Sequence, residues 1–355
     1  MPFGVVLDTF GPKICCVLGS CVQLTGAAMM YMHSTGGPML CLYVGYFLLG
    51  FGGTGIQTAT FHLANLFPNI QGTLLAASTA IFDGSTIVFP IFYSLTESGL
   101  DLSSCWIGYA GIVAVILVSG ALLWPSLPFA PPTPSAAELS AAAEPAASSK
   151  SLGSQLLSRP YIYLVLFACV HLLRLNFAVA TFATQVASLG FDDAQVEGYV
   201  ITFGRLLPFG FVGMPLIGYL LDNSSPVVVF ALINLSGVLN SSLILVPESP
   251  STLMGAIGCI AVGRQFVYST FFAQLQRSSS PSTFGTLAGI ANLFVALSGL
   301  CLSPLATLAT TFESWGLYSY APANLIVIAL MLPLFTQPLS CWKDPASSLN
   351  EKLLP

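Results

Sequence analysis

The sequence predicts an all-α polytopic membrane protein built from two related bundles of helices. Apolar residue types make up 55% of the 355 residues and charged types only 6%, whereas soluble domains carry roughly 25% charged residues. So few charges cannot cover the surface of a soluble fold of this length. Two further observations support the prediction, namely a set of long apolar stretches and an internal repeat.

Ten stretches meet the requirement of about 20 apolar residues for a helix that crosses a bilayer. They lie near residues 14–32, 39–62, 72–95, 105–126, 160–185, 197–221, 226–246, 252–274, 284–309 and 316–336. Between the fourth and fifth stretches the chain is rich in Pro, Ala and Ser, a composition that cannot bury enough apolar surface to fold. We therefore expect a truncated N-terminal bundle of four helices (1–126), a disordered cytoplasmic linker (127–158), a C-terminal six-helix bundle (159–337) and a cytoplasmic tail (338–355).

The charges outside these stretches predict the orientation. With ten spans, one side of the membrane receives all the cations outside the spans, which are Lys13, Lys150, Arg159, Arg277, Lys343 and Lys352. The other side receives only acids, which are Glu97, Asp101, Asp192, Asp193, Glu197, Glu248 and Glu313. Because cytoplasmic loops retain Lys and Arg, the linker and the C-terminus are expected in the cytoplasm.

The chain also repeats itself over a long period. Met1-Pro2 and Met214-Pro215 are 213 positions apart, and the Gly-x-x-x-Asp segments that follow, Gly4 to Asp8 and Gly218 to Asp222, are 214 apart. Pro68, Gly72, Thr73 and Leu74 match Pro281, Gly285, Thr286 and Leu287 at an offset of 213. Such a repeat in an apolar chain is typical of a duplicated membrane bundle.

The segment from Gly4 to Lys13 resembles the loop signature between helices two and three of the major facilitator superfamily. Gly4, Asp8, Gly11 and Lys13 fit that signature, and Gly218 to Asp222 keeps its opening half. The resemblance implies that Asp8 and Asp222 take part in gating, since this Asp accepts bonds from helix N-termini and basic groups. It also implies that the ten spans are helices three to twelve of that fold, so we expect helices one and two to precede Met1.

A closer resemblance is to solute-carrier family 43, which contains facilitative system-L amino-acid transporters and an equilibrative nucleobase transporter. It rests on residues 66–92, above all Gly72-Thr73 and Phe82-Asp83-Gly84-Ser85, and continues at 172–175, 215–222 and 284–289. The resemblance implies sodium-independent facilitated diffusion of a small polar metabolite, and it leaves the choice between amino acids and nucleobases open.

Four charged residues lie within the predicted spans: Asp83, Arg174, Arg205 and Arg264. Each is unfavourable by at least ~2.5 kcal/mol at a helix centre, so such residues point to function. Asp83 and Arg205 are expected to form an ion pair that either gates the transport cycle or bridges the bundle permanently. Arg174 and Arg264 have no evident acidic partner within the spans. One of them is therefore expected to bind a substrate carboxylate through its planar guanidinium.

Polar and aromatic residues at helical spacing mark three spans as lining the substrate cavity. The expected substrate-binding residues are Arg264, Arg174, Gln57, Thr58, Phe61, Thr181, Gln185, Tyr268 and Phe271. Polar stripes of this kind also hold membrane helices together, so a packing role stays open.

No catalytic triad, phosphate-binding loop or metal-ligand spacing appears in the sequence, so we expect neither an enzyme nor a cofactor or metal. The expected partners are a small-molecule substrate and the lipid bilayer, with no nucleic acid. The function predicted is uniport of neutral or large amino acids by alternating access, in the plasma membrane or an internal membrane. The alternatives are nucleobase transport and a truncated, non-transporting membrane protein.

Overall fold

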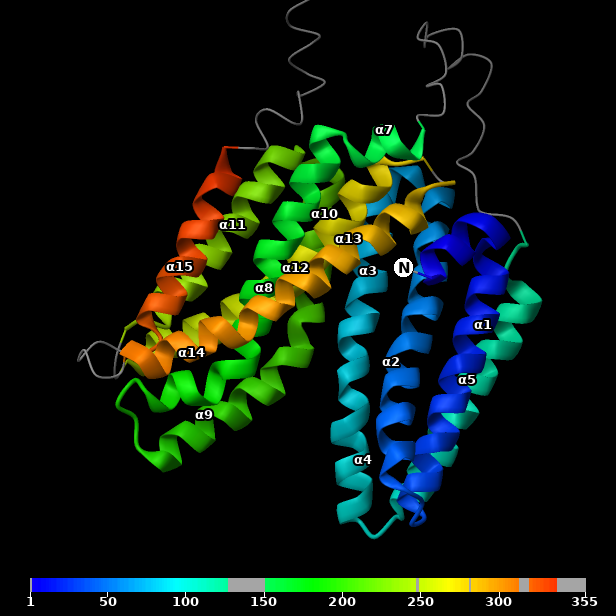
Figure 1. The fold of residues 1–355 in the computed structure, drawn as a ribbon, viewed down its shortest axis with the longest axis horizontal. Helices are drawn as coiled ribbons and strands as arrows, with labels where there is room; N and C mark the ends of the chain where they lie inside the picture. The colour runs from blue at the N-terminus through cyan, green and yellow to red at the C-terminus, as the bar shows by residue number, and fades with distance from the viewer. Residues whose placement is uncertain (1, 127–150, 247–248, 281, 313–318, 337–355) are drawn as a thin grey trace, which may run out of the picture. The chain divides into compact units, whose positions relative to one another are not determined.

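A computed structural model describes the chain except residues 1, 127–150, 247–248, 281, 313–318 and 337–355 (Figure 1). Its regular elements are all helices within the described residues. Nine helical segments of that part are long and apolar enough to cross a membrane, and a shorter one, Ala321–Phe335, follows. These ten segments coincide with the ten predicted spans. Most of the predicted linker and the predicted tail lie outside the described residues.

The chain divides into two compact units, which are described separately. Unit 1 contains residues 1–74, 85–150 and 279–290, and unit 2 contains residues 75–84, 151–278 and 291–355. Each unit thus includes a short piece from the other half of the sequence. In unit 1 this piece contains the start of α13 (Phe284–Ser298), and in unit 2 it is most of α3 (Gln71–Gly84).

Unit 1 is built on α1 (Pro2–Ser34), α2 (Met39–Phe61) and α5 (Leu102–Leu123). Helix α1 is interrupted at Gly11, whose φ of 83° and ψ of 175° are not helical. A residue with a Cβ rarely adopts this φ, which explains the Gly of the loop signature. Residues 2–10 and the span from Pro12 onward are therefore two helical pieces, and the break falls within the segment that resembles the loop signature.

Close packing of α1 on α2 depends on glycine. A Cβ added to Gly52 would lie 2.6 Å from the Gly19 carbonyl oxygen, and one added to Gly26 would lie 2.8 Å from the Leu49 nitrogen. Small residues let backbones approach in this way, which is how helices gain packing contacts in lipid. From the same face of α1, Gln23 donates a hydrogen bond to the Tyr109 hydroxyl of α5.

Unit 2 is centred on α8 (Arg159–Ala187) and α12 (Pro250–Ser278). In the apolar stretches of these helices 67% and 72% of the residues are buried, against 17% in the span that begins with α9 (Asp193–Leu206). The surrounding helices of the C-terminal half are α10 (Met214–Asn223), α11 (Pro226–Leu243), α14 (Leu302–Phe312) and α15 (Ala321–Met331). An apolar core joins α8, α14 and α15 through Leu173, Phe177, Leu305, Ala323, Val327 and Met331.

The helix starts in unit 2 follow from local sequence. Ser158 and Ser225 cap α8 and α11 by accepting a backbone N–H, and each is followed by Pro in the first turn, where a missing N–H does no harm. Asp192 and Gln195 form a capping box at α9. Ser151 caps the short helix α7 (Leu152–Leu156), so the last residues of the predicted disordered linker are in fact helical.

Several spans consist of two α-helices joined by a 3₁₀ turn. A proline lies within or close to each of these turns. Ser85–Ile87 separates α3 from α4 (Val88–Glu97), Leu207–Gly213 separates α9 from α10, and Gly299–Cys301 separates α13 from α14. Proline lacks the backbone N–H and clashes with the carbonyl four residues earlier, so the regular ladder is interrupted nearby.

Candidate functional site

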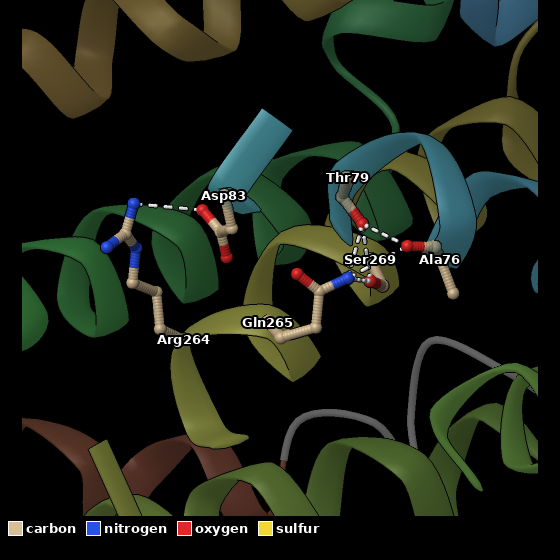
Figure 2. Close-up of polar contacts among 6 residues, drawn as sticks. All are labelled: Ala76, Thr79, Asp83, Arg264, Gln265 and Ser269. Atoms are coloured by element: carbon tan, nitrogen blue, oxygen red, sulfur yellow. Dashed lines mark hydrogen bonds and ion pairs between the residues drawn. The ribbon is translucent and has the colours of Figure 1, made fainter. Parts of the chain in front are cut away.

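An ion pair in unit 2 joins α3 to α12. The Asp83 Oδ1 atom and an Arg264 terminal nitrogen are 2.9 Å apart, and the two side chains are 5% and 20% exposed (Figure 2). The prediction that Asp83 pairs with Arg205 is wrong. The expectation that Arg264 has no acidic partner within the spans is also wrong, because its partner is Asp83. Arg205 is exposed on α9 and, among the described residues, has no acid within ion-pairing distance.

The buried amide of Gln265, the residue after Arg264, sets the register of α3 on α12 by bonding α3 one turn before Asp83. The Gln265 Nε2 atom donates to the Ala76 carbonyl (2.8 Å) and to the hydroxyls of Thr79 (2.9 Å) and Ser269 (3.1 Å) (Figure 2). The two hydroxyls also bond each other at 2.7 Å. With Thr79 fixed against Gln265, Asp83 four residues later lies beside Arg264, which is the physical reason for the observed pairing.

Gln265, Thr79 and Ser269 are not among the site residues predicted from the sequence. A signal for them exists, because Thr79 and Asp83 are four residues apart on α3, and Gln265 and Ser269 are four apart on α12. Such i, i+4 polar pairs share one helix face. Two polar faces in apolar spans are expected to meet, since buried polar groups find partners.

Of the predicted aromatic contacts on α12, one lies at the ion pair and one does not. Tyr268 is half-buried one turn after Arg264, and its phenol lies within electrostatic range of both charges. Phe271 is only 2% exposed and packs edge-on against Phe272 with ring centroids 4.9 Å apart. The structure therefore places Phe271 in the interior of unit 2.

The predicted polar residues near the end of α8 are bonded within unit 2. Gln185 donates to the Thr181 hydroxyl at 2.7 Å, and its carbonyl oxygen accepts from Asn324 of α15 at 3.1 Å. Thr181 in turn donates to the Phe177 carbonyl. These bonds join α8 to α15, which is the packing alternative that the sequence left open.

Arg174 is buried in the middle of α8, with 2% of its surface exposed. It donates from Nη1 to the Asn240 side chain of α11 at 3.0 Å. One turn earlier, His171 bonds the Asn234 side chain through Nε2 at 2.7 Å. In this structure Arg174 therefore faces neighbouring helices of unit 2.

The remaining predicted substrate contacts lie on α2 in unit 1. Gln57 and Thr58 are partly exposed, and Thr58 donates to the Thr54 carbonyl of its own helix. Phe61 is 2% exposed and packs edge-on against Phe284 with ring centroids 6.1 Å apart.

The Asp8 carboxylate lies at the N-terminus of α13, within unit 1. Its two oxygens accept the backbone N–H groups of Gly285 and Thr286 at 2.8 and 2.6 Å. These donors have no partner inside their own helix, and the helix dipole favours a negative charge there. A Cβ on Gly4 would overlap the Gly285 carbonyl oxygen, so the signature glycine permits this approach. The contact matches what the resemblance implied for Asp8.

Asp222, the counterpart of Asp8 in the repeat, lies at the end of α10. Its Oδ1 atom is 3.4 Å from an Arg277 terminal nitrogen at the end of α12. Both signature aspartates thus contact a helix end or a cation, as expected of gating residues, although gating itself remains a proposal.

A comparison with known protein families identifies the family of this chain. The model of the Major Facilitator Superfamily matches residues 1–304. The chain belongs to the major facilitator superfamily. It is therefore a multi-pass membrane protein of a transporter family, with the fold that the signature and the repeat predict.

Relatives of this superfamily member include proteins named as amino-acid transporters. Protein FMP42 of Saccharomyces cerevisiae is 25% identical over 82% of this chain and 71% of its own length. Amino acid transporter 6-1 of Toxoplasma gondii is 24% identical over 85% of this chain and 57% of its own. The human large neutral amino acids transporter small subunit 3 is 26% identical over 37% of this chain and 24% of its own length.

Solved structures confirm the fold. The E. coli fucose:proton symporter FucP matches with a TM-score of 0.67 at 14% identity, covering 97% of this chain and 87% of that chain. The human organic anion transporter MFSD10 matches with a TM-score of 0.65 at 15% identity, covering 96% of this chain and 79% of that one.

Proposed function

We propose that this protein is a facilitative uniporter of neutral, large amino acids that works by alternating access. The observation that carries the proposal is the Asp83–Arg264 ion pair, in which a carboxylate and a guanidinium lie 2.9 Å apart in the interior of apolar helices. The similarity to proteins named as amino-acid transporters supports the same substrate class.

A zwitterion is the chemical complement of this pair. The substrate carboxylate binds Arg264, whose planar fork donates two parallel hydrogen bonds to it, and the substrate ammonium binds Asp83. The substrate then replaces one ion pair by two and leaves the net charge of the site unchanged. Arg264 is the more accessible partner, with 20% of its side chain exposed, and Tyr268 beside it contacts the substrate side chain.

The ion pair also gives a reason for movement. When the substrate separates the two charges, the contact of α3 with α12 loses its ion pair and keeps the Gln265 and Thr79–Ser269 hydrogen bonds. The loss of a buried ion pair changes the free energy enough to shift an equilibrium between two conformations, one with and one without the Asp83–Arg264 contact. Substrate binding and opening are thereby coupled without a second ion, which is the basis for uniport.

Uptake of labelled leucine into proteoliposomes tests the proposal. We expect uptake that leucine analogues with both charged groups inhibit, while the α-keto acid and the amine that lack one charge do not. Arg264→Gln abolishes uptake, and a pH gradient does not drive accumulation. Competition by adenine instead of leucine indicates nucleobase transport. Absence of any uptake by a well-folded protein supports a non-transporting role.

A further inference from the structure

Arg174 carries a positive charge that no described residue neutralises. Of its three nitrogens, only Nη1 has a partner, the Asn240 carbonyl oxygen; Nε and Nη2 have none among the described residues. The Asn240 amide nitrogen donates to the Ala256 carbonyl at 2.9 Å, so this amide is fixed with its oxygen toward Arg174. Neither acid that forms an ion pair in the described chain lies against Arg174.

One turn earlier on α8, the His171–Asn234 contact leaves a second buried donor without a partner among the described residues. The Asn234 amide nitrogen is buried and also has no partner within the described residues. Its carbonyl oxygen accepts from His171 Nε2. Glycines stand at two positions facing the guanidinium, because a Cβ on Gly237 would be 3.2 Å from Arg174 Nε and one on Gly263 would be 3.8 Å from Nη2.

Water or a thiol does not resolve this imbalance. A water molecule satisfies hydrogen bonds but leaves the charge, and an unpaired buried charge is strongly destabilising. Cys259 of α12 interacts electrostatically with Arg174, but a protonated thiol carries no charge. The site therefore lacks a group that carries one negative charge and accepts hydrogen bonds from several directions.

We propose that Arg174 binds a small inorganic monovalent anion, chloride, between α8, α11 and α12. Chloride supplies a single charge and accepts hydrogen bonds from any direction, which fits the Nε and Nη2 edge of the guanidinium. A carboxylate of the transported substrate has related chemistry, so the test separates the two sources. The site is independent of the Asp83–Arg264 pair, and its anion stabilises the fold of unit 2.

Thermal unfolding of the purified protein in detergent tests the proposal without any transport assay. Sodium chloride and sodium gluconate are compared at equal ionic strength, with no substrate present. We expect a melting temperature higher by about 3 °C or more in chloride, because a ligand that binds only the folded state stabilises it. The difference disappears in Arg174→Gln and persists in Arg205→Gln, which removes an exposed arginine.

Each other outcome overturns the proposal. An equal melting temperature in the two salts for the wild type excludes a chloride site. A chloride effect that survives in Arg174→Gln places the anion elsewhere. Stabilisation by leucine in gluconate, lost in Arg174→Gln, identifies the substrate carboxylate as the anion. If no chloride effect exists and Cys259→Ser destabilises as strongly as Arg174→Gln, the counter-charge is a thiolate.

A second measurement does not depend on the variant folding. Bromide replaces chloride and scatters anomalously, so crystals of the wild-type protein grown in bromide should show a peak beside the Arg174 guanidinium. A bromide-grown crystal without that peak contradicts the proposal, whatever the behaviour of Arg174→Gln.

Discussion

The Asp8 carboxylate and the backbone N–H of Gly285 are hydrogen-bonded at 2.8 Å across 277 positions of the sequence. Both belong to the repeat that the sequence shows, Asp8 through the Gly-x-x-x-Asp segment and Gly285 through the Gly-Thr pair. Two motifs that are separate in the sequence therefore meet at one helix N-terminus. This contact and the Asp83–Arg264 pair are the two places where the structure can be tested most directly.

Replacing Asp8 by Asn weakens the contact with α13. The amide keeps one acceptor oxygen but turns an NH₂ donor toward the N–H of Gly285 or Thr286, and the charge that favours the helix N-terminus is lost. We expect a loss of about 1–2 kcal/mol, seen as a lower melting temperature, and a lower uptake rate. Asp101→Asn is the matched control, because Asp101 precedes α5 without a side-chain capping bond. Equal melting temperatures for Asp8→Asn and the wild type would contradict the assignment.

Adding one methyl group to Gly285 should disrupt the same contact sterically. A Cβ there would overlap the Gly4 carbonyl oxygen and lie 2.9 Å from Asp8 Oδ1. Because backbone atoms cannot move aside cheaply, Gly285→Ala should destabilise by about 1–3 kcal/mol. Gly258→Ala in α12 is the control, since nothing lies within 4 Å of its Cβ and Ala favours a helix. Fluorescence-detected melting curves of the two variants should differ clearly.

Removing one partner of the Asp83–Arg264 pair leaves the other charge unpaired within the spans. Asp83→Asn and Arg264→Gln should each lower stability by about 3 kcal/mol or more, since an unpaired buried charge is uncompensated. The double variant is neutral at this point and should recover most of that stability. If the proposed function holds, it still fails to transport leucine. A double variant that is as unstable as the sum of the single ones would argue against a direct pair.

The Gln265 hydrogen bonds should show coupling in a double-mutant cycle. Gln265→Leu removes the donor to Thr79, and Thr79→Val removes the acceptor with little change of shape. We expect the two stability losses to be non-additive by about 0.5–2 kcal/mol. Gln265→Leu combined with Asn324→Ala serves as the additive reference, because Asn324 bonds Gln185 instead. Coupling of equal size in both cycles would mean that the effect is not specific to the α3–α12 contact.

The helices and the fold were predictable from the sequence because each depends on local composition. The ten apolar stretches coincide with the observed segments, since length and hydropathy suffice to define a span. Gly11 interrupts α1 within the segment that resembles the loop signature, because only a residue without a Cβ adopts its φ of 83° readily. The repeat and the signature also predicted the superfamily, which the match over residues 1–304 confirms.

The pairings of buried charges required the tertiary structure. Sequence shows that Asp83, Arg174, Arg205 and Arg264 lie within spans, but their partners depend on the rotation and register of one helix against another. A rotation of about 100° per residue turns neighbouring positions to different helices, and the register of α3 on α12 is set by Gln265 and Thr79. The sequence therefore determined which charges enter the membrane, whereas helix packing decided that Asp83 neutralises Arg264 and that Arg174 has no counter-charge among the described residues.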